Sequence, residues 1–169
     1  MGQYLGCINE SKNKEIMENT AETIELLNDL VLINNDRIEG FERAIKELEE
    51  NGDEGGLMPY FLRFIDESRR YKMELGGEIQ VLGHDIEQGT SIEGKLHRAW
   101  IAVKETFTGH DLHSLLEECE RGEDAIKHAY EDALNEEWLP AYVRDILDDQ
   151  LDQIIEAHDE IRSFRDSVH

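Results

Sequence analysis

The chain has 169 residues, of which 40 are aspartate or glutamate and 17 are lysine or arginine, so its formal net charge is −23. A surface this acidic repels nucleic-acid phosphates and anionic lipid headgroups, and we expect neither nucleic acid nor membrane as a partner. No apolar run approaches the roughly 18 residues that a membrane-spanning helix needs. The two cysteines, Cys7 and Cys119, are too few and too far apart for a disulfide framework. These features together favour a cytoplasmic protein.

The first 18 residues are polar and lack the apolar core of a signal peptide. We interpret residues 1–18 as a leader that need not be ordered, with Met17 as an alternative start. Residues 19–167 are predicted to form a single domain.

Between about residues 20 and 50, apolar side chains recur three and four residues apart, which is the spacing of one helix face. Asn19 and Glu22 have the spacing of a capped helix start. The polar and glycine-rich residues 51–56 end this helix, and so short a loop makes the next helix antiparallel to it. The expected buried face is formed by Ile24, Leu27, Leu30, Val31, Ile38, Phe41, Ile45 and Leu48.

The same spacing predicts long helices over about 58–82, 111–134 and 140–165. Asp111 is expected to cap the helix that follows it, and Pro140 suits the first turn of the last helix. In the third long helix, Asp124 and His128 lie four residues apart and are interpreted as a surface pair rather than as metal ligands.

The chain is therefore predicted to be all-α, a four-helix bundle with a short extra helix in the connection between helices two and three. The capping box Thr90–Glu93 opens this short helix, which continues to about Phe107. At about 1.5 Å per residue it spans roughly 24 Å. The connection can thus carry the chain back along the bundle, as in ferritin-like folds. A simple up-down order, with the short helix at one end, is the alternative.

Five segments resemble an uncharacterised ferritin-like four-helix-bundle family found mainly in proteobacteria. They are LLNDLVLINNDRIEGFERA, FIDESRRY, LHRAWIAVK, LEECERGEDAIKHAYEDAL and the closing H-D-x-I-R. The resemblance covers roughly residues 20–166, and ECERGEDA is its most specific part. It implies a ferritin-like fold and no established activity.

The wider ferritin-like class often holds two metal ions, bound by a glutamate from each of two helices and a Glu-x-x-His from each of the other two. Carboxylates and imidazoles of this kind suit iron or manganese. Glu67, Glu123 and His158 are plausible ligands in this sequence, whereas Asn34, Arg70 and Ile155 depart from the pattern. The positions that the resemblance brings out are Asn34, Glu67, Arg70, Glu120, Glu123, Ile155 and His158.

We interpret these positions as a vacated core site, in which the guanidinium of Arg70 replaces the metal and pairs with Glu67 and with a carboxylate of helix three, Glu123 or Glu120. No catalytic residue and no cofactor are then expected. The function predicted is that of a non-catalytic bundle that acts through self-association or contact with another protein. The alternative is a di-iron or di-manganese oxidoreductase, or an iron-handling protein, with Glu67, Glu123 and His158 as ligands.

Overall fold

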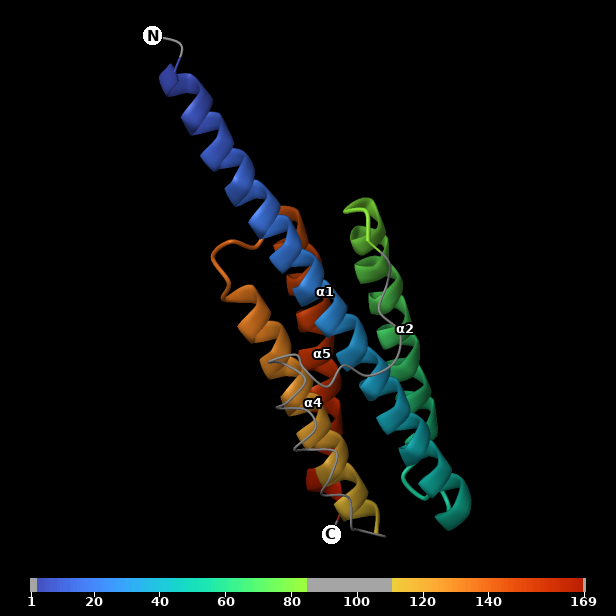
Figure 1. Cartoon of the computed structure of the whole chain (residues 1–169). Helices are drawn as coiled ribbons and strands as arrows, with labels where there is room; N and C mark the ends of the chain where they lie inside the picture. The colour runs from blue at the N-terminus through green and yellow to red at the C-terminus, as the bar shows by residue number, and fades with distance from the viewer. Residues whose placement is uncertain (1–2, 85–110, 169) are drawn as a thin grey trace.

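The computed structural model describes residues 3–84 and 111–168, with side chains from residue 9 onward. The described residues form four α-helices and no strand: α1 (Gln3–Asn51), α2 (Met58–Val81), α4 (Leu112–Leu134) and α5 (Ala141–Ser167) (Figure 1). The prediction of an all-α chain with four long helices is confirmed. The short helix predicted over 90–107 lies outside the described residues.

Helix α1 begins much earlier than its sequence indicated. It is helical from Gln3, so the predicted start at Asn19 is wrong and most of residues 1–18 belong to this helix. Asn19 is therefore an interior position of this helix, and its carbonyl accepts a hydrogen bond from the Thr23 hydroxyl at 2.7 Å. No proline precedes Pro59 to stop the helix. The first turns of α1 extend beyond the ends of the other helices (Figure 1).

The loop between α1 and α2 ends one helix and starts the next within a few residues. Gly52 and Gly56 adopt positive φ angles of 95° and 63°, which other residues rarely tolerate. Asp53 then accepts hydrogen bonds from the backbone N–H groups of Leu57 and Met58, at 2.7 and 3.1 Å, at the start of α2. The predicted helical hairpin is thereby confirmed.

The start of α4 matches the sequence prediction. The Asp111 carboxylate accepts a hydrogen bond from the Ser114 backbone N–H at 2.8 Å, as an N-cap does. The hydrogen bonds from Ser114 lower the pKa of Asp111. Pro140 immediately precedes α5, where its missing N–H costs no hydrogen bond.

The core consists of two apolar clusters, one toward each end of the bundle. The first takes residues from the middle of α1 and from the C-terminal halves of both α2 and α4; its largest fully buried members include Leu27, Leu30, Ile33, Tyr71, Leu75, Ile79 and Tyr130. The second takes residues from the C-terminal part of α1 and the N-terminal halves of α2 and α4, and includes Phe41, Phe61, Phe64, Leu116 and Ile161.

This sharing of clusters fixes the directions of the helices. Because α2 and α4 contribute corresponding halves to each cluster, they run parallel, and α1 and α5 run opposite to them. Accordingly, α2 ends near the top of the bundle whereas α4 begins at the bottom (Figure 1). The simple up-down order is therefore wrong, because α2 ends and α4 begins at opposite ends of the bundle.

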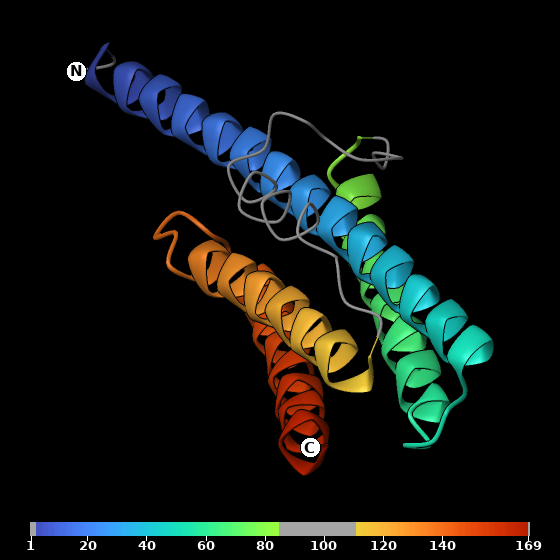
Figure 2. The same ribbon diagram turned by 90° about the horizontal axis from the view of Figure 1, so that it is seen from below.

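The four helices are arranged as two hairpins, α1 with α2 and α4 with α5, that meet mainly where α1 packs on α4 (Figure 2). None of the helices within the described ranges combines the length and the hydrophobicity of a membrane span.

Candidate functional site

A buried arginine from α1 lies at the junction of the two hairpins. Arg37 is only 1% exposed and binds the Glu123 carboxylate of α4 with two parallel hydrogen bonds, Nε to Oε1 at 2.7 Å and Nη2 to Oε2 at 2.9 Å. Its third nitrogen, Nη1, donates to the Ser68 hydroxyl at 3.0 Å and to the Phe64 carbonyl at 3.3 Å, both on α2. One guanidinium therefore links three helices through hydrogen bonds that match its planar geometry.

A second carboxylate, from α2, approaches the same guanidinium. Glu67 Oε2 lies 3.7 Å from Arg37 Nη2, and its other oxygen lies 3.8 Å from Arg63. Burial raises the pKa of Glu67 above its ordinary value, although the charges of Arg37 and Arg63 oppose this effect. Burial alone would lower the pKa of Arg37, but the charge and hydrogen bonds of Glu123 outweigh it and raise that pKa. The site thus places the Arg37 guanidinium between the side-chain carboxyl groups of Glu123 and Glu67, with Arg63 on the outer side of Glu67.

The predicted role of Arg70 is wrong. Its side chain is exposed and donates to the Gln153 side-chain oxygen at 2.6 Å, which also accepts from the Tyr71 hydroxyl. The buried positions of α2 include Ser68 and Tyr71, so residue 70 lies on the outer face of this helix. Arg37, one helix away in the bundle, makes the contact that we had assigned to Arg70.

Asn34 belongs to a separate buried network. Its amide nitrogen donates to the Leu30 carbonyl and to the Tyr130 hydroxyl, both at 2.9 Å, and that hydroxyl donates to the Gln150 side-chain oxygen at 2.7 Å. Burial raises the pKa of Tyr130, so the hydroxyl keeps its proton at neutral pH. This chain of polar groups ties α1 to α4 and α5. Ile155, another predicted position, is half buried on α5.

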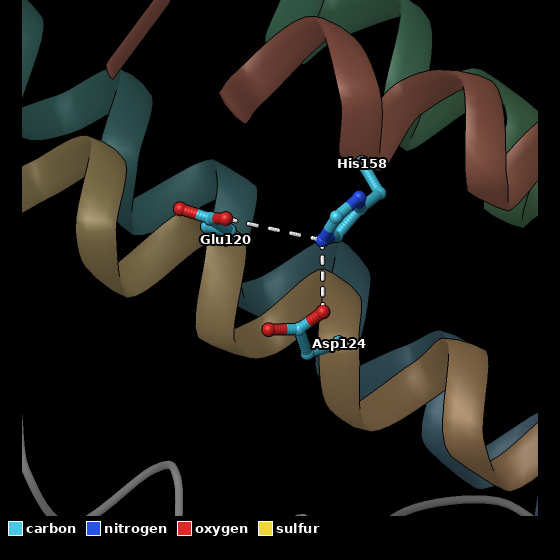
Figure 3. A group of neighbouring side chains, drawn as sticks. All are labelled: Glu120, Asp124 and His158. Carbon is cyan, nitrogen blue, oxygen red and sulfur yellow. Dashed lines mark ion pairs between the residues drawn. The ribbon is translucent and has the colours of Figure 1, made fainter. Parts of the chain in front are cut away.

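A third group of polar side chains lies between α4 and α5 (Figure 3). His158 Nε2 is 2.8 Å from Asp124 Oδ1 and 4.0 Å from Glu120 Oε1, and its Nδ1 is 3.1 Å from Asp159 Oδ1. Glu120 also accepts a hydrogen bond from Arg165 through its other oxygen. One ligand atom from each of Glu120, Asp124 and His158 lies within 4.8 Å of the other two, a spacing that can hold a metal ion.

The structure therefore divides the predicted positions among three sites. Glu67 and Glu123 face Arg37, whereas His158 on α5 faces Glu120 and Asp124 of α4. His128, the predicted partner of Asp124, instead lies 3.1 Å from Glu131.

Sequence reasoning missed Arg37 and Asp124 as members of these sites. Arg37 falls on the buried face of α1, three residues after Asn34 and four before Phe41, so an arginine inside an apolar stripe was the available indication. Glu123, on the buried face of α4, carries the opposite charge and was the matching indication of a partner for Arg37. Asp124 had a weaker indication, because its four-residue spacing from Glu120 places both on one helix face.

Residues 22–136 match the model of a family described as a domain of unknown function, DUF2383. The chain belongs to this family. The DUF2383 region contains α2, α4 and most of α1, and hence Arg37, Glu67 and Glu123. It ends before α5, so His158 lies outside it. No curated protein matches the chain.

Proposed function

We propose that this chain is a non-catalytic helical-bundle protein of the ferritin-like class, in which Arg37 takes the place of a dinuclear metal centre. The observation that carries this proposal is the bidentate hydrogen bonding of Arg37 to Glu123. Glu67 lies on the other side of the Arg37 guanidinium. A guanidinium keeps its charge at all physiological pH values, so it supplies a positive charge beside the Glu123 and Glu67 carboxylates without a metal ion.

The remaining core positions support the same proposal. Asn34 has an amide where a dinuclear metal centre would need a carboxylate, and its amide nitrogen binds Tyr130. Ile155 has no atom that could bind a metal ion. The helix order, two hairpins with α2 parallel to α4, is compatible with the single long crossover of ferritin-like folds. The resemblance to the proteobacterial ferritin-like family supports this assignment from the sequence side.

Elemental analysis of protein purified without affinity tags or chelators tests the proposal. We expect no iron or manganese that depends on Glu67 or Glu123, so the Glu67→Gln variant should contain the same metals as the wild type. About two iron or manganese ions per chain, lost in Glu67→Gln and retained in the exposed control Glu74→Gln, would overturn the proposal. That result would favour the di-iron or di-manganese oxidoreductase instead.

We propose further that the protein acts through self-association, by the first turns of α1. Ile16 and Met17 are 54% and 72% exposed there, on a helix that extends beyond the rest of the bundle (Figure 1). Residues 3–18 carry two lysines and three glutamates, whereas the whole chain has a net charge of −23. Two copies would therefore repel each other least through this segment.

Light scattering coupled to size-exclusion chromatography tests self-association. We expect the wild type to be larger than a monomer and the Ile16→Glu/Met17→Glu variant to be a monomer. Leu62→Glu/Met73→Glu changes two exposed apolar residues of α2 and should leave the mass unchanged. A monomeric wild type, or equal masses for all three proteins, would contradict this part of the proposal.

A further inference from the structure

We infer that Glu120, Asp124 and His158 bind one divalent first-row transition-metal ion, such as Zn²⁺ or Mn²⁺, between α4 and α5. This site is separate from the core cluster around Arg37, and it does not depend on the proposed function of that cluster. It uses one imidazole nitrogen and two carboxylate oxygens (Figure 3).

The distances between the ligand atoms suit a metal ion. Metal–ligand bonds of about 2.0–2.2 Å place neighbouring ligand atoms roughly 3.0–3.5 Å apart. The observed separations from His158 Nε2, 2.8 Å to Asp124 and 4.0 Å to Glu120, lie on either side of this range. Asp124 has a side chain that is 48% exposed and can adjust, whereas Glu120 and His158 are largely buried and hold their positions.

The surroundings orient the ligands as in known metal sites. A metal-binding histidine usually donates its second ring N–H to a carboxylate, which fixes the ring and leaves the other nitrogen for the metal. Asp159 Oδ1, 3.1 Å from His158 Nδ1, is placed to accept that hydrogen bond. Arg165 binds only the Oε2 atom of Glu120, so Oε1 remains directed toward His158. Nε2, 2.8 Å from Asp124 Oδ1, is then the ring nitrogen left to bind the ion.

The chemistry of the donors limits the class of ion. One imidazole with two carboxylates suits zinc, manganese or ferrous iron, whereas calcium and magnesium prefer oxygen ligands alone. Glu120, Asp124 and Asp159 are three acidic groups around His158, and the guanidinium of Arg165 is shared between Glu120 and Asp166. The ion can reach the site from solvent past Asp124, whose side chain is 48% exposed. Three protein ligands leave the remaining coordination positions of the ion for water.

The experiment is calorimetric titration of the full chain, freed of metal by dialysis, with Zn²⁺ and separately with Mn²⁺. Sodium chloride and excess Mg²⁺ suppress general attraction of cations to the acidic surface. We expect saturation at one ion per chain. Asp124→Asn should weaken binding by at least about tenfold, and Asp159→Ala by roughly 10- to 100-fold because the ring loses its orienting hydrogen-bond acceptor. Co²⁺ added in place of Zn²⁺ reports on the imidazole, and His158→Gln should change the visible d–d bands of the bound Co²⁺.

Matched controls separate this site from other acidic residues. Asp148→Asn removes an exposed aspartate of α5, and His128→Gln removes the exposed histidine next to Glu131 on α4. Both controls should bind within about twofold of the wild type. Asp124 is half exposed, so Asp124→Asn remains informative even if His158→Gln does not fold.

Equal affinities for the wild type, Asp124→Asn and Asp148→Asn would overturn the inference and indicate nonspecific binding. Loss of binding in Glu67→Gln, with Asp124→Asn unaffected, would also overturn it and would place the ion in the core, against the proposed function as well. Loss in Asp124→Asn alone supports the site and leaves the proposed function intact.

Discussion

Arg37 places a permanent charge inside the bundle, where its desolvation is costly unless its partners are well aligned. Its five donors are largely used: three nitrogens contact Glu123, Ser68 and Phe64, and the guanidinium lies 5.5 and 5.7 Å from the ring centres of Phe41 and Phe64. A lysine could not reproduce this planar, bidentate contact, because its ammonium group is a single point charge. The pair therefore joins α1 to α4 at one defined position along each helix.

Replacing Arg37 by methionine should lower the free energy of unfolding by about 3–5 kcal/mol, because the Glu123 carboxylate is left buried without its partner. Urea denaturation measures this loss. The double variant Arg37→Met/Glu123→Leu should recover most of it, since a buried ion pair can often be replaced by apolar side chains.

Arg70→Met is the matched control, because it removes an exposed guanidinium and should cost less than about 1 kcal/mol. Equal losses for Arg37→Met and Arg70→Met would contradict the assignment of the buried role to Arg37.

Glu67 should make stability depend on pH in a defined direction. Its pKa is raised in the folded protein, mainly by burial, so the ionised carboxylate is less favourable in the folded than in the unfolded chain. This cost is present at neutral pH and disappears as the pH falls through the folded pKa and then below the ordinary value of about 4.5. Glu67→Gln, which resembles the protonated form, should therefore be more stable than the wild type at pH 7 and equal to it at low pH.

Urea denaturation at several pH values checks this difference. Glu74→Gln removes a carboxylate from the exposed face of the same helix and corrects for the general relief of negative charge. A Glu67→Gln variant that follows Glu74→Gln at every pH would show that the raised pKa has no effect on stability.

The helices are stabilised more by the packing of their apolar faces than by the intrinsic helix propensity of their residues. Leu27 was expected on such a face from the sequence, and in the structure Leu27 on α1 and Ile154 on α5 both have no exposed surface. Both belong to the apolar cluster that joins the two hairpins.

Leu27→Ala and Ile154→Ala should each lower the free energy of unfolding by about 2–5 kcal/mol, through lost burial and the cavity left behind. Thermal or urea denaturation measures the loss. Leu62→Ala, at a half-exposed position of α2, should cost much less. Losses below about half a kcal/mol at both buried positions would mean that these faces do not form the core.

Over the whole molecule, the net charge of −23 makes the folded chain repel itself. Salt screens this repulsion, because the Debye length falls from about 30 Å at 0.01 M to about 8 Å at 0.15 M. The melting temperature should therefore rise as sodium chloride increases over this range. Potassium chloride should have the same effect if screening is the cause, and a flat or falling melting temperature would contradict it.

The sequence by itself determined the helices and much of the core. Apolar spacing located all four long helices and the buried face of the first. Asp111 and the glycines at 52 and 56 marked helix ends, because these features depend on residues close together in the chain. The start of α1 was misplaced, since Asn19 and Glu22 have a capping pattern that an uninterrupted helix can also contain. A cap is decided by the backbone around it and not by its residue types alone.

Only the tertiary structure decided which charged residues meet. The sequence indicated buried charges on α2, α4 and α5, but it could not give the rotation of α1 that brings Arg37, and not Arg70, to Glu123. It also could not decide that His158 on α5 faces Asp124 on α4, nor that α2 and α4 run parallel. These pairings join residues far apart in the chain. They depend on how the helices rotate and align when their apolar faces pack, which helical spacing within one segment does not specify.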